Sequence, residues 1–170
     1  HSAPTYEITA SLTVVGAPIL RLRLLDEDGA HMPARFHVAI DGEQHVPAGL
    51  GEHGLRFVTK HQKKKQRFTA LYARGSGAVE VPLPADGRRG TVTAVRGLQY
   101  LTAVESFEMT ADTVDVSLRL SRWTDLRQRG WLAADAHLHY ERLEPAHDHD
   151  WLRLLAAEDL SLAHFLVLKG

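Results

Sequence analysis

The sequence alternates sharply in the run Ile19-Leu20-Arg21-Leu22-Arg23-Leu24-Leu25, where leucines and arginines take turns. Successive side chains of a β-strand point to opposite faces, so this spacing gives one apolar face and one solvated face. The run Thr113–Leu120 alternates in the same way between aliphatic and polar residues. Both runs are therefore predicted as antiparallel strands, each with one side against a core and one side in water.

Short runs of similar composition fill the chain on either side of these two. They are rich in Val, Ile, Thr, Phe and Tyr, and turn signals such as Asp41-Gly42 and Asp86-Gly87 separate them. The predicted strands are Tyr6–Val15, Ile19–Leu25, Ala34–Ile40, Leu55–Thr59, Phe68–Ala73, Val79–Leu83, Thr91–Val95, Leu101–Met109 and Thr113–Leu120. Strands at this spacing predict an antiparallel β-sandwich over residues 1–122.

The pattern changes beyond the sandwich, where residues 123–130 form a polar linker and residues 131–170 a second unit. The predicted elements of this unit are a strand at Trp131–Tyr140, a polar loop at Glu141–His149, a helix at Asp150–Leu160 and a strand at Leu162–Leu168. Strand, helix and buried strand make a βαβ unit, which belongs to a parallel sheet or barrel. One such unit cannot bury both of its faces. We expect the remaining strands from further sequence, with another chain or the sandwich as alternatives.

Composition narrows the function classes. The formal net charge is −1, which gives no global attraction to nucleic acid. The chain has no cysteine, so disulfides and thiolate metal sites are excluded. No apolar stretch reaches the roughly 20 residues of a membrane span, and no signal peptide is predicted within the chain. The compartment stays open, and a secreted or periplasmic bacterial location is one expectation.

Three polar residues at alternate positions, Asp135, His137 and His139, carry the strongest chemical signal. Residues at i, i+2 and i+4 of a strand share one face, and two imidazoles roughly 6.6 Å apart can tilt toward a common ion. Neutral imidazole suits zinc and related divalent metals, and the carboxylate could ligate the ion or orient an imidazole. The alternative is a half-exposed strand whose histidines bond only to solvent or backbone.

Around these residues the sequence resembles a known family. Residues 130–139, Gly-Trp-Leu-Ala-Ala-Asp-Ala-His-Leu-His, resemble the first motif of the PHP (polymerase and histidinol phosphatase) metal-dependent hydrolases, in the CehA/McbA-like branch. Residues 24–29 and 33–36 are similar to the start of the transthyretin-like or carboxypeptidase-regulatory-like sandwich that often precedes that domain. The resemblance implies that His137 and His139 bind metal in a distorted (β/α)7 barrel. It also implies hydrolysis of ester, amide or phosphoester bonds.

The second predicted strand of this unit departs from the family pattern. Family members usually end that strand with an Asp-His pair, whereas the run from His164 to Gly170 has neither residue at its C-terminal end. His164 itself is predicted to be a core histidine. His147 and His149, in the predicted loop, could add a ligand or a general base, and a solvated helix start is the alternative. No catalytic residue is assigned.

Two acidic residues and two candidate caps complete the predictions for the helix. Asp148 or Asp150 is the predicted N-cap. Glu158 and Asp159 lie near the helix end, where the dipole disfavours acids. They are predicted either to pair locally with Arg153 or to be solvated.

The fold class predicted from all of this is mainly β, an antiparallel β-sandwich followed by the truncated start of a (β/α)7-type barrel. The expected function is that of the N-terminal portion of a metal-dependent hydrolase, inactive as the present chain. The expected cofactor is a divalent ion, zinc first, with manganese or iron as alternatives. The expected partner is a small-molecule or carbohydrate-like substrate of the complete enzyme, with no nucleic acid, and a homo-oligomer is left open. The alternative is a non-catalytic β-sandwich binding module.

Overall fold

The structure is a computed structural model that describes residues 16–61, 66–140 and 145–167. The predicted strand Tyr6–Val15 and residues 141–144 of the predicted loop lie outside these ranges. The elements are β1 (Ile19–Leu25), β2 (Pro33–Ile40), β3 (Glu43–His45), β4 (Gly54–His61), β5 (Gln66–Arg74), β6 (Val79–Pro82), β7 (Arg89–Val95), β8 (Ala103–Glu108), β9 (Thr113–Arg119), the 3-10 helix η1 (Arg127–Arg129), β10 (Ala134–Tyr140), α1 (Ala146–Ala157) and β11 (Leu162–Val167). The prediction of a mainly β chain is confirmed.

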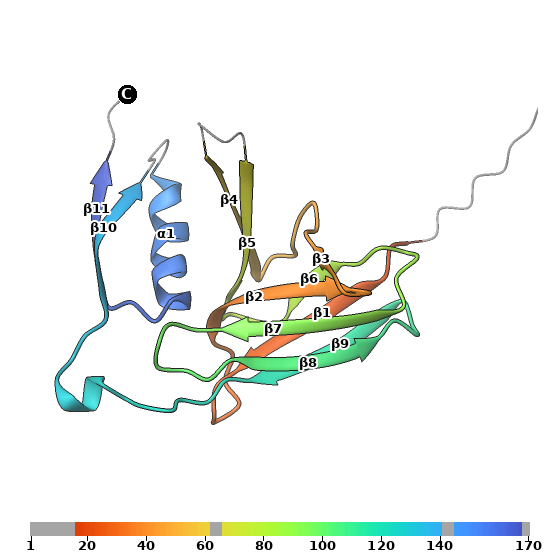
Figure 1. The fold of residues 1–170 in the computed structure, drawn as a ribbon, viewed down its shortest axis with the longest axis horizontal. Coiled ribbons are helices and arrows are strands. Elements are labelled where there is room, and N and C mark those ends of the chain that lie inside the picture. The colour runs from red at the N-terminus through yellow and green to blue at the C-terminus, as the bar shows by residue number, and fades with distance from the viewer. Residues whose placement is uncertain (1–15, 62–65, 141–144, 168–170) are drawn as a thin grey trace, which may run out of the picture.

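Strands β1 to β9 form two sheets that face each other across an apolar core (Figure 1). One sheet has the order β6-β1-β9. The other has the order β4-β5-β2-β7-β8, with β3 added beside β2, and all its pairings are antiparallel. The alternation read from the sequence places the inward side chains of both sheets in this core. The core includes Leu20, Leu22, Leu24, Phe36, Val38, Leu71, Val79, Val81, Val92, Val116, Leu118 and Leu120.

The two most clearly alternating strands, β1 and β9, pair with each other in parallel rather than antiparallel. The prediction that each run is an antiparallel strand holds for β1, which pairs antiparallel with β6, but not for its pairing with β9. Alternation reports which face of a strand is buried and not which way its neighbour runs. Their solvated faces meet side by side. There the guanidinium Nη1 of Arg23 lies 2.9 Å from Oδ1 of Asp115.

The linker is held against the loop between β7 and β8. The indole Nε1 of Trp123 donates to the carbonyl of Leu98 at 2.9 Å, and the backbone N–H of Leu126 donates to Oε1 of Gln99 at 2.6 Å. Helix η1 follows and ends at Gly130, whose φ of 81° lies in the left-handed region that favours glycine. These contacts fix the direction in which the chain enters β10.

Strands β10 and β11 pair in parallel, and α1 connects them. The predicted order of strand, helix and strand is therefore confirmed, but the helix begins earlier than predicted. It starts at Ala146 after Pro145, and no side chain caps it, so the predicted N-caps Asp148 and Asp150 are wrong. The φ of Pro145, −60°, already suits a first helical turn, which is why the helix can begin there.

Helix α1 lies between the β10–β11 pair and the β4–β5 part of the sandwich (Figure 1). Trp151 of α1 makes the bridge. Its ring centroid is 5.4 Å from that of Phe57 in β4 and 6.0 Å from that of Phe165 in β11, both in edge-to-face geometry. Leu154 and Ala157 pack with Tyr72 of β5 in the same cluster. The sandwich therefore covers one side of the helix in the βαβ unit, and the described residues add no third strand to the β10–β11 sheet.

A buried carboxylate fastens the end of α1 to the sandwich and the linker. Asp159 is 2% exposed, and its oxygens lie 3.3 Å from Nη2 of Arg96, 3.5 Å from Nη1 of Arg122 and 3.0 Å from Nη2 of Arg127. Gln99 Nε2 also donates to it at 3.3 Å. The predicted alternatives for Asp159, a pair with Arg153 or solvation, are both wrong. Charged groups are almost never fully buried unless they are paired, and here the partners come from distant segments.

Helices of the kind that can cross a membrane are absent from the part of the chain that the structure describes.

Candidate metal centre

Strand β10 brings two imidazoles together at its C-terminal half. The Nε2 atoms of His137 and His139 are 3.0 Å apart, and their ring centroids are 4.9 Å apart at an angle of 51°. Both side chains are exposed. Without metal this separation fits an N–H···N hydrogen bond between one donor and one acceptor ring. Two metal–nitrogen bonds of about 2.0–2.1 Å can also span it, so the pair can serve as two ligands of one ion.

The histidine pair lies on the face of β10 that is turned away from α1. Leu138 is paired with Phe165, and Phe165 packs on Trp151, so Leu138 faces the helix. His139 is instead opposite Leu166, on the outer face. Neighbouring residues of a strand point to opposite sides, which places the imidazole of His139 away from the helix.

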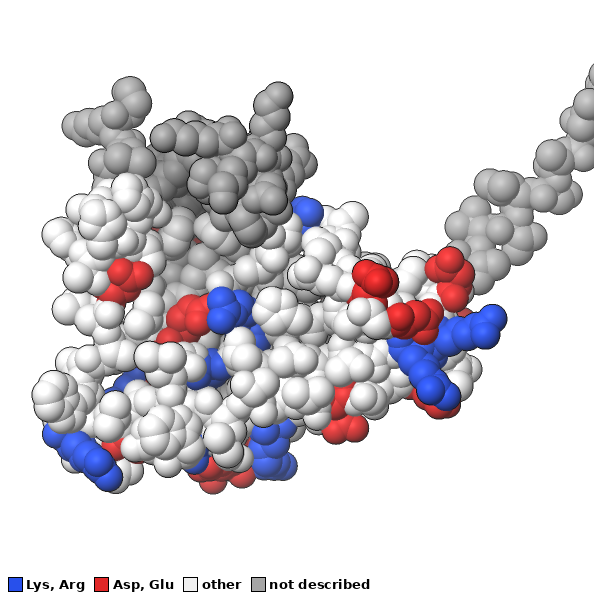
Figure 2. All heavy atoms as spheres, viewed as in Figure 1, with Lys and Arg blue, Asp and Glu red and all other residues white. Residues whose placement is uncertain are grey.

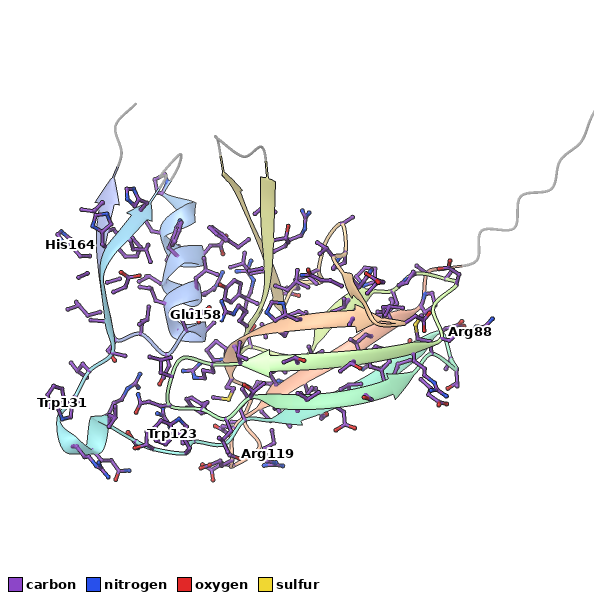
Figure 3. All side chains as sticks on the ribbon, viewed as in Figure 1. Arg88, Arg119, Trp123, Trp131, Glu158 and His164 are labelled. Carbon is purple, nitrogen blue, oxygen red and sulfur yellow. The ribbon has the colours of Figure 1, made fainter. Side chains whose placement is uncertain are left out.

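The outer face is open to solvent and partly apolar. Leu162, the first residue of β11, is 65% exposed. His164 follows it on the same face and points away from α1 (Figure 3), so the prediction of a core histidine is wrong. Alternate residues of β11 face either Trp151 or solvent, and position 164 falls on the solvent side. Parallel sheets are ordinarily covered on both faces, so this surface is unusual for its type.

Asp135 is not brought together with the two imidazoles. Its Oδ1 accepts a hydrogen bond of 2.9 Å from the backbone N–H of His137. The pairing register of β10 also shifts between Asp135 and Leu138, which interrupts the alternation on which a shared face depends. The sequence signal for this arrangement was present, since Asp side chains commonly bond the backbone two residues further on.

The histidines expected to add a ligand from the loop are placed on helix α1 instead. His149 is exposed near the start of α1, and the side chain of His147 lies outside the described residues. Within residues 16–61, 66–140 and 145–167, no three His, Asp or Glu side chains are grouped to hold an ion. A catalytic zinc usually has three protein ligands, so two imidazoles alone do not make up such a ligand set.

Other surface features of the described chain lie away from the histidine pair. A shallow cavity of about 500 Å³ lies over β7 and β8 at Gly90 and Phe107, and one of about 280 Å³ lies beside Asp41 and His45. Figure 2 shows acidic and basic side chains interspersed on the visible face. Neither cavity is lined by His137 or His139.

Comparison of the chain with protein families, curated proteins and solved structures finds no match. The resemblance to the PHP hydrolases therefore stays a prediction, and it rests on residues 24–29, 33–36 and 130–139.

Proposed function

We propose that this chain is the N-terminal portion of a PHP-type metal-dependent hydrolase, in which His137 and His139 provide two ligands of a divalent ion. The observation that carries the proposal is the 3.0 Å approach of their Nε2 atoms on an open strand face. In the proposal the chain supplies a sandwich, a linker and the first strand, helix and strand of a barrel.

The placement of helix α1 supports a barrel. In a parallel β/α barrel the helices form the outer ring, and side chains that point away from them line the interior. The imidazole of His139 points away from α1, toward the side that would be the interior. Active sites of such barrels lie at the C-terminal ends of the strands, and His137 and His139 lie in the C-terminal half of β10.

The open outer face fits the same proposal. Additional strands would bury Leu162, which is 65% exposed, and would bring further polar side chains to the histidine pair. Imidazole ligands suit zinc first, and manganese or iron remain alternatives. A bound divalent ion would supply Lewis acidity and would lower the pKa of its bound water to about 7. Hydroxide would then be available to hydrolyse an ester, amide or phosphoester. His137 and His139 would hold this ion, and the substrate is proposed as a small or carbohydrate-like molecule.

The sandwich has a positioning role in this proposal. Trp151 and Asp159 hold the helix and its following turn against β4, the β7–β8 loop and the linker. The barrel would therefore be fixed to the sandwich through its first helix, on the outside and away from the histidine pair.

Metal analysis of the protein from the complete reading frame tests the proposal. We expect the purified protein to contain divalent metal and the double variant His137→Ala/His139→Ala to lose it. The matched control is His31→Ala/His37→Ala, which removes two exposed imidazoles elsewhere and should keep the metal. Unchanged metal content in the first variant would contradict the proposal. A reading frame that stops at Gly170 would contradict it as well.

The second candidate is a non-catalytic binding module in which the βαβ unit is an integral part of the sandwich. The packing of α1 on β4 and β5 favours this candidate, because the helix of the βαβ unit is already packed against the sandwich. Chelator-sensitive hydrolysis by the complete protein would reject the module. Metal-free protein without hydrolase activity would support it.

A further inference from the structure

We infer that Asp135 is a positioning residue that fixes a bulge in β10 and thereby turns the imidazoles of His137 and His139 toward each other. This inference rests on the proposed metal site and assigns Asp135 a role in it other than that of a ligand. Three observations carry it: the pairing register of β10, the hydrogen bond of the Asp135 carboxylate, and the distance between the two rings.

The register shows one extra residue in β10. Asp135 is opposite Ala163 and Leu138 is opposite Phe165, so three steps along β10 match two steps along β11. An extra residue of this kind leaves part of the strand out of the ladder, bends it and increases its twist. Ala136 and His137 lie within this segment.

The Asp135 side chain accepts a hydrogen bond from the backbone at the bulge. Its Oδ1 accepts the N–H of His137 at 2.9 Å, two residues along the chain. A backbone N–H that leaves a ladder needs another acceptor, and a short carboxylate two residues earlier reaches it without help from elsewhere. Asp135 is half-buried, and this hydrogen bond fixes the orientation of the peptide that precedes the His137 side chain.

The approach of the rings is the consequence. In a regular strand, the Cα atoms at i and i+2 are roughly 6.6 Å apart, so two imidazoles must lean toward each other to meet. The ring centroids of His137 and His139 are 4.9 Å apart, and their Nε2 atoms 3.0 Å apart. The bulge bends the backbone between Asp135 and Leu138 and so turns His137 toward His139.

This role requires a hydrogen-bond acceptor and not a charge. Asparagine has a carbonyl oxygen at the position of the carboxylate oxygen, so Asp135→Asn should keep the bulge. Asp135→Ala removes the acceptor, and the bulge should then no longer be held in place. A role as metal ligand alone predicts that neither substitution moves the rings in the metal-free chain, so Asp135→Ala distinguishes the two roles.

Nuclear magnetic resonance on the metal-free chain reads the geometry directly. We expect an Overhauser effect between the His137 and His139 rings in the wild type and in Asp135→Asn, and its loss in Asp135→Ala. The His137 amide should exchange with solvent about tenfold faster in Asp135→Ala. A zinc titration of the protein from the complete reading frame should then show affinity weakened by roughly 10–100-fold in Asp135→Ala and nearly unchanged in Asp135→Asn.

The outcomes separate the inference from the proposed function. Retention of the ring contact and of amide protection in Asp135→Ala would overturn the inference, and so would loss of both in Asp135→Asn. If zinc binds the wild type and His137→Ala/His139→Ala equally, the proposed metal site fails. The ring contact in the metal-free variants still decides the role of Asp135 in that case.

Discussion

Nη2 of Arg127 lies 3.0 Å from Oδ1 of Asp159, although the two residues are 32 positions apart in the chain. Arg127 belongs to η1 in the linker, and Asp159 follows α1. Arg96 and Arg122 approach the same carboxylate, so it joins the linker, the sandwich and the βαβ unit at one point. Loss of its charge would leave three guanidinium groups close together without their shared counter-ion.

We expect Asp159→Asn to lower the free energy of unfolding by about 3 kcal/mol, because breaking a buried ion pair leaves uncompensated charge. Asparagine tolerates the φ of 55° at this position and can still accept hydrogen bonds, so the variant isolates the charge. Urea unfolding provides the measurement. The control is Asp115→Asn, which removes the exposed pair with Arg23 and should cost less than about 1 kcal/mol. Equal losses in the two variants would contradict the assigned role.

The aromatic bridge of Trp151 gives a second prediction. Trp151→Ala removes the contacts with Phe57 and Phe165, and we expect a loss of about 2 kcal/mol, since the indole is only partly buried. Hydrogen exchange should rise in α1, β10 and β11 while β1 to β9 stay protected. Leu152→Ala, an exposed neighbour on the same helix, is the control and should change little. A uniform rise over the whole chain would show that Trp151 does not hold a separate unit.

Strand positions were readable from the sequence because one-sided burial leaves a period of two. The predicted strands Ile19–Leu25 and Ala34–Ile40 match β1 and β2 almost residue for residue. Strand β3, Glu43–His45, was missed because its three residues are polar and too few to show a period. The sequence also does not show that β1 and β9 pair in parallel, since the same face of each strand is buried in a parallel and in an antiparallel pair.

Contacts between distant segments account for what the sequence did not show. The Lys or Arg residue nearest to Asp159 in the sequence is Arg153, and local spacing therefore predicts that pair. Arg153 instead pairs with Asp150 at 3.3 Å, and Asp159 takes partners from three other segments. No local pattern encodes such a cluster.

The candidate site was predictable in part. The sequence shows that His137 and His139 are two residues apart, which predicts that their side chains lie near each other, and the structure places their Nε2 atoms 3.0 Å apart. The bulge between Asp135 and Leu138 was not predicted, because an extra residue becomes visible only when β10 is paired with β11. Metal binding by the pair stays a prediction.

The phenol of Tyr72 makes stability depend on pH at high pH. Burial, and next the negative charge of Glu158, raise the pKa of Tyr72 from 10 to about 12 in the folded chain. The unfolded chain therefore loses this proton first. The stabilisation is complete below pH 10 and is lost as the pH rises toward 12, by roughly 2–3 kcal/mol in all.

Urea unfolding from pH 9 to pH 12 measures this effect. The stability difference between the wild type and Tyr72→Phe should narrow over the interval, because phenylalanine has no proton to lose. The matched control is Tyr100→Phe, which removes the hydroxyl of a half-buried tyrosine that stacks on Arg122. A constant difference between wild type and Tyr72→Phe would mean that the phenol titrates alike in both states.

A substitution on the solvent-exposed face of β11 distinguishes the two candidate functions, a metal-dependent hydrolase and a non-catalytic binding module. If further strands cover it in the complete protein, Leu162→Asp places an unpaired charge in that interface and should cost about 3 kcal/mol or more there. In the present chain, where Leu162 is 65% exposed, the same substitution should cost about 1 kcal/mol or less. Val104→Asp on β8, at a strand position of similar exposure, controls for placing Asp in a strand. A small cost of Leu162→Asp in both proteins would mean that this face stays in water, as a non-catalytic module requires and a barrel interior does not allow.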